Sequence, residues 1–120
     1  MSDRELWEMA AKAAGMWGEA FEIEEDSDRP VFDAAKGFRL AFGRGWWNPL
    51  ADDGDALRLA VKVGIAVYPP EADGDDATCN GPYPLSCWHS ETVLNGDLYA
   101  ATRRAIVRAA AAIGAAKEPT

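Results

Sequence analysis

The stretch of sequence that decides the fold is Trp46-Trp47-Asn48-Pro49-Leu50-Ala51-Asp52-Asp53-Gly54-Asp55-Ala56-Leu57-Arg58-Leu59-Ala60-Val61. It joins two large aromatic residues to an Asn-Pro break and then to an acidic helix start. Pro49 disfavours helical geometry at Asn48, so a helix cannot extend backwards through this point. Asp52 can cap the first turn by accepting hydrogen bonds from its free N–H groups. A helix is therefore expected to begin at about residue 53.

The apolar residues of the same stretch predict which face of this helix is buried. Leu57, Ala60 and Val61 recur at the i, i+3, i+4 spacing of one helix face. Gly64 is a natural stop, because glycine readily adopts the left-handed geometry found at helix ends. We expect a helix over about 53–63 with these three side chains in the core.

Helices are also expected at both ends of the chain. Ser2 and Glu5 have the spacing of a capping box, which predicts a helix over about 3–14. Asp97 is placed to cap another helix, which runs from about 98 to a stop at Gly114. The stripe expected to be buried on this last helix consists of Leu98, Thr102, Ala105, Ile106, Ala109 and Ile113.

Alternating apolar and polar residues predict four short strands between these helices, each with one buried face. The strands are expected at about 21–24, 38–42, 65–68 and 85–89, and the turn-rich residues 71–82 are expected to form an exposed loop. The element order is then α-β-β-α-β-β-α. We expect an α+β fold, a single α/β/α sandwich in which helices cover one four-stranded, largely antiparallel sheet.

Length and composition limit the classes of protein to consider. The 120 residues suffice for one domain, with an ordered core over about 3–114 and a frayed tail over 115–120. The net charge of −8 repels phosphate backbones and disfavours direct nucleic-acid binding. No apolar run approaches the ~20 residues that span a bilayer, and the N-terminus lacks the features of a signal peptide. A cytoplasmic protein is expected, in which Cys79 and Cys87 are free thiols.

Three segments of the chain share their pattern with a known family. They are the block Trp47-Asn48-Pro49-Leu50 continued by 53–61, the tail from Tyr99 to Ala110, and the opening Arg4-Glu5-Leu6 with 10–15. In this order they resemble the phage ABA sandwich domain family of small bacteriophage and prophage proteins, over roughly half of the chain. The resemblance implies an α/β/α sandwich and a phage origin. It implies no established activity, so no catalytic residue is carried over.

This context suggests what the protein does. Small phage proteins often act on host machinery, including bacterial immune systems such as CRISPR–Cas. We therefore expect a non-enzymatic binding protein that inhibits a host defence complex by occlusion, in an anti-CRISPR-like manner, in the bacterial host cytoplasm. The alternative is a phage accessory or assembly protein that self-associates or binds another phage protein.

Two acidic segments are the candidate surface for a basic host protein. Residues 19–28 hold six carboxylates in ten positions, and 71–76 is rich in aspartate. Charge complementarity to an arginine-lined groove would speed association, although an ordinary solvated surface is the favoured interpretation of either segment. Trp46, Trp47 and Trp88 are core candidates, and any that is exposed would be an interface anchor. The residues assigned to partner binding are Glu22, Glu24, Glu25, Asp26, Asp28, Trp47, Asp73, Asp75 and Asp76.

Two clusters contain side chains that can bind a metal ion, but neither has the spacing of a known metal site. The aspartates of 52–55 could hold a hard cation, but capping of the helix start explains them. Cys79, Cys87 and His89 give Cys-x7-Cys-x-His, which is three ligands where structural zinc sites take four. A Cys–His nucleophile pair on this segment would lack an orienting third group. We therefore expect no metal, no cofactor and no enzymatic activity.

Arg103, Arg104 and Arg108 lie outside the buried stripe of the last helix. They form either a basic binding stripe or a solvated face that pairs with the many carboxylates of the protein. The second interpretation is favoured, because isolated surface charges usually contribute little to stability or binding.

Overall fold

A computed structural model describes residues 1–82 and 88–117, which form three α-helices and two three-stranded antiparallel sheets. The helices are α1 (Asp3–Ala13), α2 (Asp53–Val63) and α3 (Leu98–Lys117). The smaller sheet contains β1 (Phe32–Asp33), β2 (Gly37–Arg39) and β3 (Trp46–Trp47), and the larger contains β4 (Ala66–Tyr68), β5 (Asp76–Asn80) and β6 (Trp88–Thr92). The α+β class is therefore confirmed, whereas the single four-stranded sheet is wrong.

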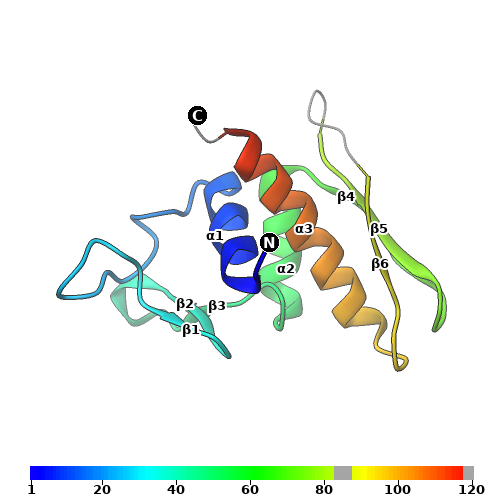
Figure 1. Ribbon diagram of the computed structural model, residues 1–120, viewed down its shortest axis with the longest axis horizontal. Helices are drawn as coiled ribbons and strands as arrows, with labels where there is room; N and C mark the ends of the chain where they lie inside the picture. Colours follow the sequence, from blue (N-terminus) through cyan, green and yellow to red (C-terminus); the bar gives the residue numbers. More distant parts are fainter. Residues whose placement is uncertain (83–87, 118–120) are drawn as a thin grey trace.

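Helix α3 lies at the centre of the molecule (Figure 1). It contacts α1 and α2 on one side and strands β5 and β6 on the other. The expected stripe is buried at four of its six positions, and Leu98 and Thr102 are half-buried. Because two layers enclose the helix, residues outside the stripe are buried as well: Ala101, Val107, Ala110 and Ala111.

The prediction that α3 stops at Gly114 is wrong, since the helix continues to Lys117. Gly114 is buried where α3 meets α1, and a Cβ atom added there would overlap the carbonyl group of Met9. Glycine at this position therefore allows close approach of two helices rather than ending one. Residues 115–117 are helical, and 118–120 lie outside the described residues.

The starts of all three helices agree with their capping predictions. Ser2 and Glu5 form both hydrogen bonds of a capping box at α1. The Asp52 carboxylate accepts from the Asp55 N–H at α2, and the Asp97 carboxylate accepts from the Ala100 N–H at α3. These bonds satisfy N–H groups that have no partner within a helix.

The predicted buried face of α2 is only partly correct. Ala60 is buried, but Leu57 and Val61 are 63% and 74% exposed. The helix is rotated so that Leu59 and the small residue Ala56 face the core with Ala60. Two large apolar side chains consequently remain on the surface of the helix.

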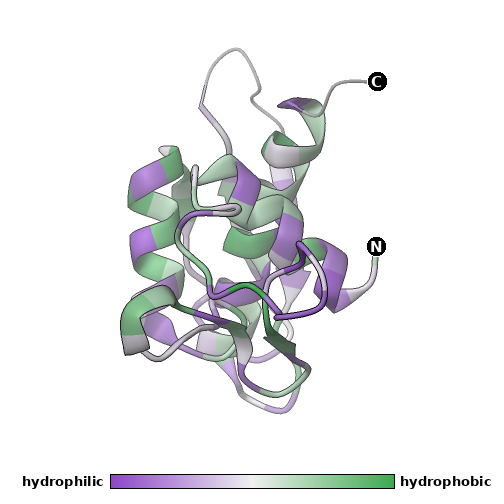
Figure 2. Cartoon of the chain, turned by 90° about the vertical axis from the view of Figure 1, so that its left-hand side faces the viewer, coloured by the Kyte–Doolittle hydropathy of each residue, from purple (hydrophilic) through white to green (hydrophobic). Residues whose placement is uncertain are grey.

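The smaller sheet differs in detail from the strands expected before α2. Residues 21–24 form no continuous strand and make two isolated bridges, Phe21 with Leu40 and Ile23 with Pro30. Strand β2 pairs with the Trp46–Trp47 strand, which is not among the four expected strands. Viewed from this end, the chain alternates hydrophilic and strongly hydrophobic segments (Figure 2).

The larger sheet contains a strand that was expected to be a loop. Strand β5 lies within 71–82, because Ala77 and Cys79 alternate with polar residues and are fully buried. The next strand was expected at 85–89 and is found at Trp88–Thr92, while 83–87 lie outside the described residues. Helix α3 covers one face of this sheet, and no described helix covers the other (Figure 1). The expected sandwich with helices on both faces is therefore absent from the described part of the chain.

No helix in 1–82 or 88–117 combines the length and the apolar character that are needed to cross a membrane.

The contact between α1 and α3 predicts a large effect of Gly114→Ala. The added methyl group overlaps the Met9 carbonyl, so the helices must separate, and we expect a loss of about 1–3 kcal/mol in the free energy of unfolding. Urea denaturation followed by circular dichroism measures this loss. Gly54→Ala in the first turn of α2 is the control, because the atoms nearest to its methyl group are the side-chain ends of Arg58 and Asp52, not backbone. Equal stability of both variants and the parent would contradict the close approach.

Candidate binding groove

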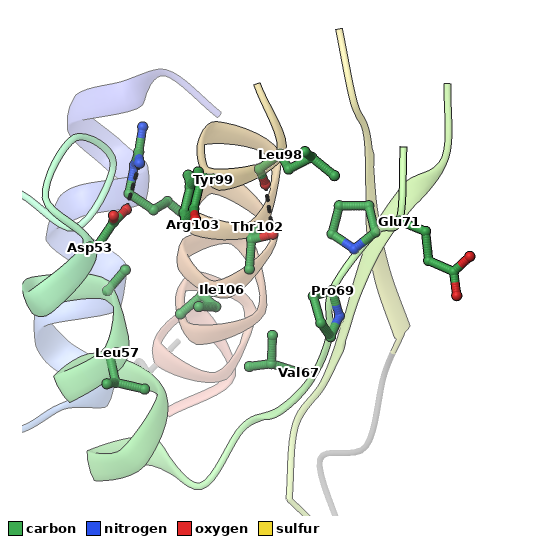
Figure 3. A pocket seen from close by; sticks show the side chains of 12 residues that line it. Asp53, Leu57, Val67, Pro69, Glu71, Leu98, Tyr99, Thr102, Arg103 and Ile106 are labelled. Carbon is green, nitrogen blue, oxygen red and sulfur yellow. Dashed lines mark hydrogen bonds and ion pairs between the residues drawn. The ribbon is translucent and has the colours of Figure 1, made fainter. Parts of the chain in front are cut away.

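An open groove of about 550 Å³ lies between α2, α3 and the β4 end of the larger sheet. Figure 3 shows Ile106 from α3 and Val67 from β4 pointing into the same space, with Leu57 on the α2 side. Carbon atoms make up most of the lining surface. We call this feature the α2–α3–β4 groove. It is lined by Asp53, Ala56, Leu57, Val67, Pro69, Pro70, Glu71, Leu98, Tyr99, Thr102, Arg103 and Ile106.

Apolar side chains in the groove are exposed to an unusual degree. Leu57 is 63% exposed on the α2 wall, and Tyr99 is 69% exposed at the start of α3. Large exposed apolar patches on a folded protein mark sites of interaction more often than single exposed residues do. The groove therefore offers surface that a ligand can remove from water.

Three polar side chains of the groove, those of Thr102, Arg103 and Asp53, already have partners within the protein. The Thr102 hydroxyl donates to the Leu98 carbonyl at 2.8 Å. The Arg103 guanidinium donates to the Leu50 carbonyl at 2.8 Å and to the Asp53 carboxylate at 2.6 Å. Because few polar atoms are left to direct a polar ligand or to do chemistry, the groove suits an apolar segment.

Two residues of the Trp46–Val61 stretch fix the start of α2. The Asn48 N–H donates to the Asp55 carboxylate at 2.9 Å, and the Asn48 side chain donates to the Ala35 carbonyl at 3.0 Å. Both residues are buried. The Asn-Pro break therefore joins the smaller sheet to α2, and the Arg103 bonds join α2 to α3. Together these contacts position the α2 wall of the groove.

More than half of the residues that line the groove come from a stretch of the chain without lysine or arginine. This stretch, residues 63–102, contains six carboxylates. Glu71 lines the groove, and the Asp73 carboxylate accepts from the Gly96 N–H at 3.0 Å, which holds the acidic 71–76 loop against the turn before α3. A ligand that enters from this end meets negative charge, so positively charged ligands are favoured.

The two predicted acidic segments do not form one surface. Residues 19–28 lie at the end of the molecule that holds the smaller sheet, and 71–76 lie at the opposite end of the 45 Å long axis (Figure 1). Of the first segment, Glu22 forms an ion pair with Arg39 at 3.1 Å. Glu24, Glu25, Asp26 and Asp28 are exposed, and their role in binding stays a prediction.

The aspartates of the second segment are exposed but have local structural roles. Asp75 accepts from the Ala72 N–H at 3.0 Å, and Asp76 accepts from the Thr92 hydroxyl at 2.8 Å. Only this segment adjoins the groove. Of the two segments, it is the one that can contribute to binding there.

The expectation that Trp47 contacts a partner does not agree with its position in the structure. Trp47 is only 4% exposed and packs against Phe21, so it belongs to the core. Trp46 is half-buried, because adjacent residues of a strand point to opposite faces and only Trp47 faces the core. Trp88 is 59% exposed on the outer face of the larger sheet, where its ring lies 5.4 Å from that of Tyr68. The exposed anchor candidate is therefore Trp88.

The aspartates of 52–55 have the structural roles that capping suggested. Asp52 caps α2, Asp53 pairs with Arg103, and the Asp55 carboxylate accepts from Arg58 at 2.8 Å as well as from Asn48. The arginines outside the buried stripe of α3 have acidic partners as well. Arg104 forms an ion pair with Asp3, and Arg108 forms one with Glu91. In the described ranges, no three side chains of the ligand types come together to hold a metal ion.

Cys79 and His89 lie directly opposite each other on β5 and β6, but they do not form an activated pair. Burial raises the pKa of the Cys79 thiol to about 11. Burial and the nearby Arg108 lower the pKa of His89. Both shifts favour the neutral forms, whereas a cysteine nucleophile needs a thiolate. Cys87 lies outside the described residues.

No family model, curated protein or solved structure matches this chain. The interpretation of the groove therefore depends on its own geometry.

The groove was not predicted from the sequence. Its α2 wall contains Leu57, which helical spacing assigned to the core. The sequence of α2 nevertheless indicates that some apolar side chains stay uncovered, because Leu57, Leu59 and Val61 lie on different sides of the helix and cannot all face the same neighbour. The absence of lysine and arginine from 63–102 is also visible in the sequence and indicates an acidic surface.

The Asn48–Asp55 contact predicts that Asp55→Ala destabilises the protein. The substitution leaves the buried Asn48 N–H without its acceptor, and we expect a loss of about 1.5–3 kcal/mol in the free energy of unfolding. Arg58→Ala is the matched control, because it removes the exposed partner of the same carboxylate and a longer 3.8 Å contact with Asp52, and it should have a much smaller effect. Urea denaturation of the two variants measures the difference. Equal losses would show that the ion pair, not the backbone contact, is the stabilising interaction.

The burial of Cys79 predicts that its thiol is inert in the folded protein. In a Cys87→Ser variant, the remaining thiol should react with Ellman's reagent only after unfolding in urea, because it is both buried and un-ionised. The unfolded chain ionises this thiol near pH 9.0, below the folded pKa of about 11, so stability should fall as the pH rises through that interval. Fast labelling of the native variant at pH 8 would contradict the buried position.

Proposed function

We propose that this protein is a non-enzymatic binding protein that takes an apolar segment of a basic partner protein into the α2–α3–β4 groove. The observation that supports the proposal best is the groove itself, in which Leu57 and Tyr99 remain largely exposed beside satisfied polar groups. Apolar pockets with few polar groups are the usual binding sites of folded proteins.

The charge of the protein supports a basic partner. The carboxylates of 63–102 have no lysine or arginine among them, and Glu71 lies on the groove. Opposite charge across an interface increases the association rate and discriminates against acidic partners. Nucleic acid is disfavoured by the same charge, because binding to phosphates requires clustered lysine and arginine.

A host defence complex is the partner class that we propose to test first. This part of the proposal comes from the resemblance to phage ABA sandwich proteins, and occlusion of a basic surface would be its mechanism. The alternative, a phage accessory or assembly protein, uses the same groove for another phage protein. Mass spectrometry of proteins captured from infected cells and from uninfected host cells separates the two.

Substitutions in the groove test the proposal. Leu57→Asp places a charge on the α2 wall, and we expect captured partner to bind at least about tenfold more weakly. Val61→Asp is the matched control, because Val61 is at least as exposed as Leu57 on the same helix but does not line the groove. Surface plasmon resonance with the captured partner measures both affinities. Equal binding by the two variants would exclude the groove as the site.

Charge-reversal substitutions in the two acidic segments, 19–28 and 71–76, show which of them contacts the partner. Glu71→Lys should weaken binding and reduce its dependence on salt, because it alters the charge beside the groove. Glu25→Lys is the control at the far end of the molecule and should have no effect. If the triple variant Glu22→Lys, Glu24→Lys, Glu25→Lys loses binding while Glu71→Lys keeps it, the partner binds the smaller-sheet end instead.

A further inference from the structure

We infer that the groove binds its partner as an extended strand, which adds to the open edge of β4. This inference rests on the proposed function and specifies the conformation of the bound segment. Strand β4 is the outer strand of its sheet, with β5 on one side. In the described part of the chain no strand lies along its other edge, and the Val67 side chain, on the face of the sheet toward α3, points into the adjoining groove (Figure 3).

The backbone of β4 has unused hydrogen-bonding groups at this edge. Successive residues of a strand direct their N–H and C=O groups to alternate sides. Either Val67, or both Ala66 and Tyr68, therefore direct these groups away from β5. In the described part of the chain, no hydrogen bond outside the sheet involves any of the three residues. An extended segment beside β4 would supply partners for them, as in the recognition of peptides by sheet edges.

The surfaces on both sides of β4 can receive the side chains of an added strand, which point alternately to its two faces. One face of the added strand would lie over α3, where Ile106 and Val67 point into the groove (Figure 3). The other face would lie beside Tyr68 and Trp88 on the uncovered side of the sheet. Both surfaces are apolar or aromatic. A segment with apolar residues at alternate positions can therefore bury side chains on both faces at once.

Pro69 and Pro70 limit the length of the added strand. Proline has no N–H group, so pairing with β4 must end at Tyr68. The acidic 71–76 loop follows at that end, which places basic residues of the bound segment beside it. The ligand class is therefore a short extended peptide with alternating apolar residues and a basic flank.

Selection of peptides from a random display library tests the inference with a defined probe. The parent protein is the target, and the Leu57→Asp variant is used for counter-selection. We expect the selected peptides to have apolar residues at i and i+2 with lysine or arginine at one end. Backbone N-methylation of the best peptide at alternate positions should weaken binding by about tenfold, because each methyl group removes one hydrogen bond to β4. Methylation at the intervening positions should have little effect.

The outcomes separate this inference from the proposed function. Peptides with apolar residues at i, i+3 and i+4, unaffected by alternate N-methylation, would bind as a helix and overturn the strand inference alone. If counter-selection against the Leu57→Asp variant removes every peptide that binds the parent, the groove is not the site, and the proposed function is overturned with it. Hydrogen exchange by NMR adds a direct readout, since an amide of residues 66–68 should gain protection only when a strand is added.

Discussion

The two-sided burial of α3 is the constraint on which the rest of the structure depends. One helix must pack against α1 and α2 on one side and against the larger sheet on the other. Small residues make this possible, because Ala105, Ala110 and Gly114 let neighbouring backbones approach closely. A helix with large side chains at these positions would hold the two layers apart. The sheet and the helices would then no longer share one core.

The groove follows from the way in which α2 meets α3. The Asn48–Asp55 bond and the Arg103 bonds fix α2 at its N-terminal end, and its small residues Ala56 and Ala60 face the core. The chain then turns at Gly64 and leads into β4. Because α2 and β4 diverge from this turn, the surface of α3 between them is left uncovered. The cavity is thus a consequence of helix placement, not of a specialised loop.

Local signals in the sequence predicted local structure well. Side-chain caps depend on residues three positions apart, so Ser2 with Glu5, Asp52 and Asp97 were all identified correctly. Helix bounds failed at Gly114, because the sequence does not show whether a glycine ends a helix or meets another backbone.

Features that depend on distant contacts could not be predicted from the pattern alone. The division into two sheets depends on pairing between segments such as Phe38 and Trp47. The strand at Asp76–Asn80 was hidden by acidic and turn-forming neighbours. The candidate site was missed for a related reason: helical spacing shows that Leu57 is on an apolar face, but only the rotation of α2 decides whether that face is covered.

Within residues 1–82 and 88–117, the larger sheet has open edges at both β4 and β6, and this feature affects how copies of the protein behave at high concentration. Pairing of one molecule's β4 with another's β6 would not close on itself, and repeated addition would give a filament. Three properties oppose such growth: the shortness of β4, the prolines that follow it, and the shared negative charge of 63–102. The same edge can thus accept one short foreign strand while resisting polymerisation.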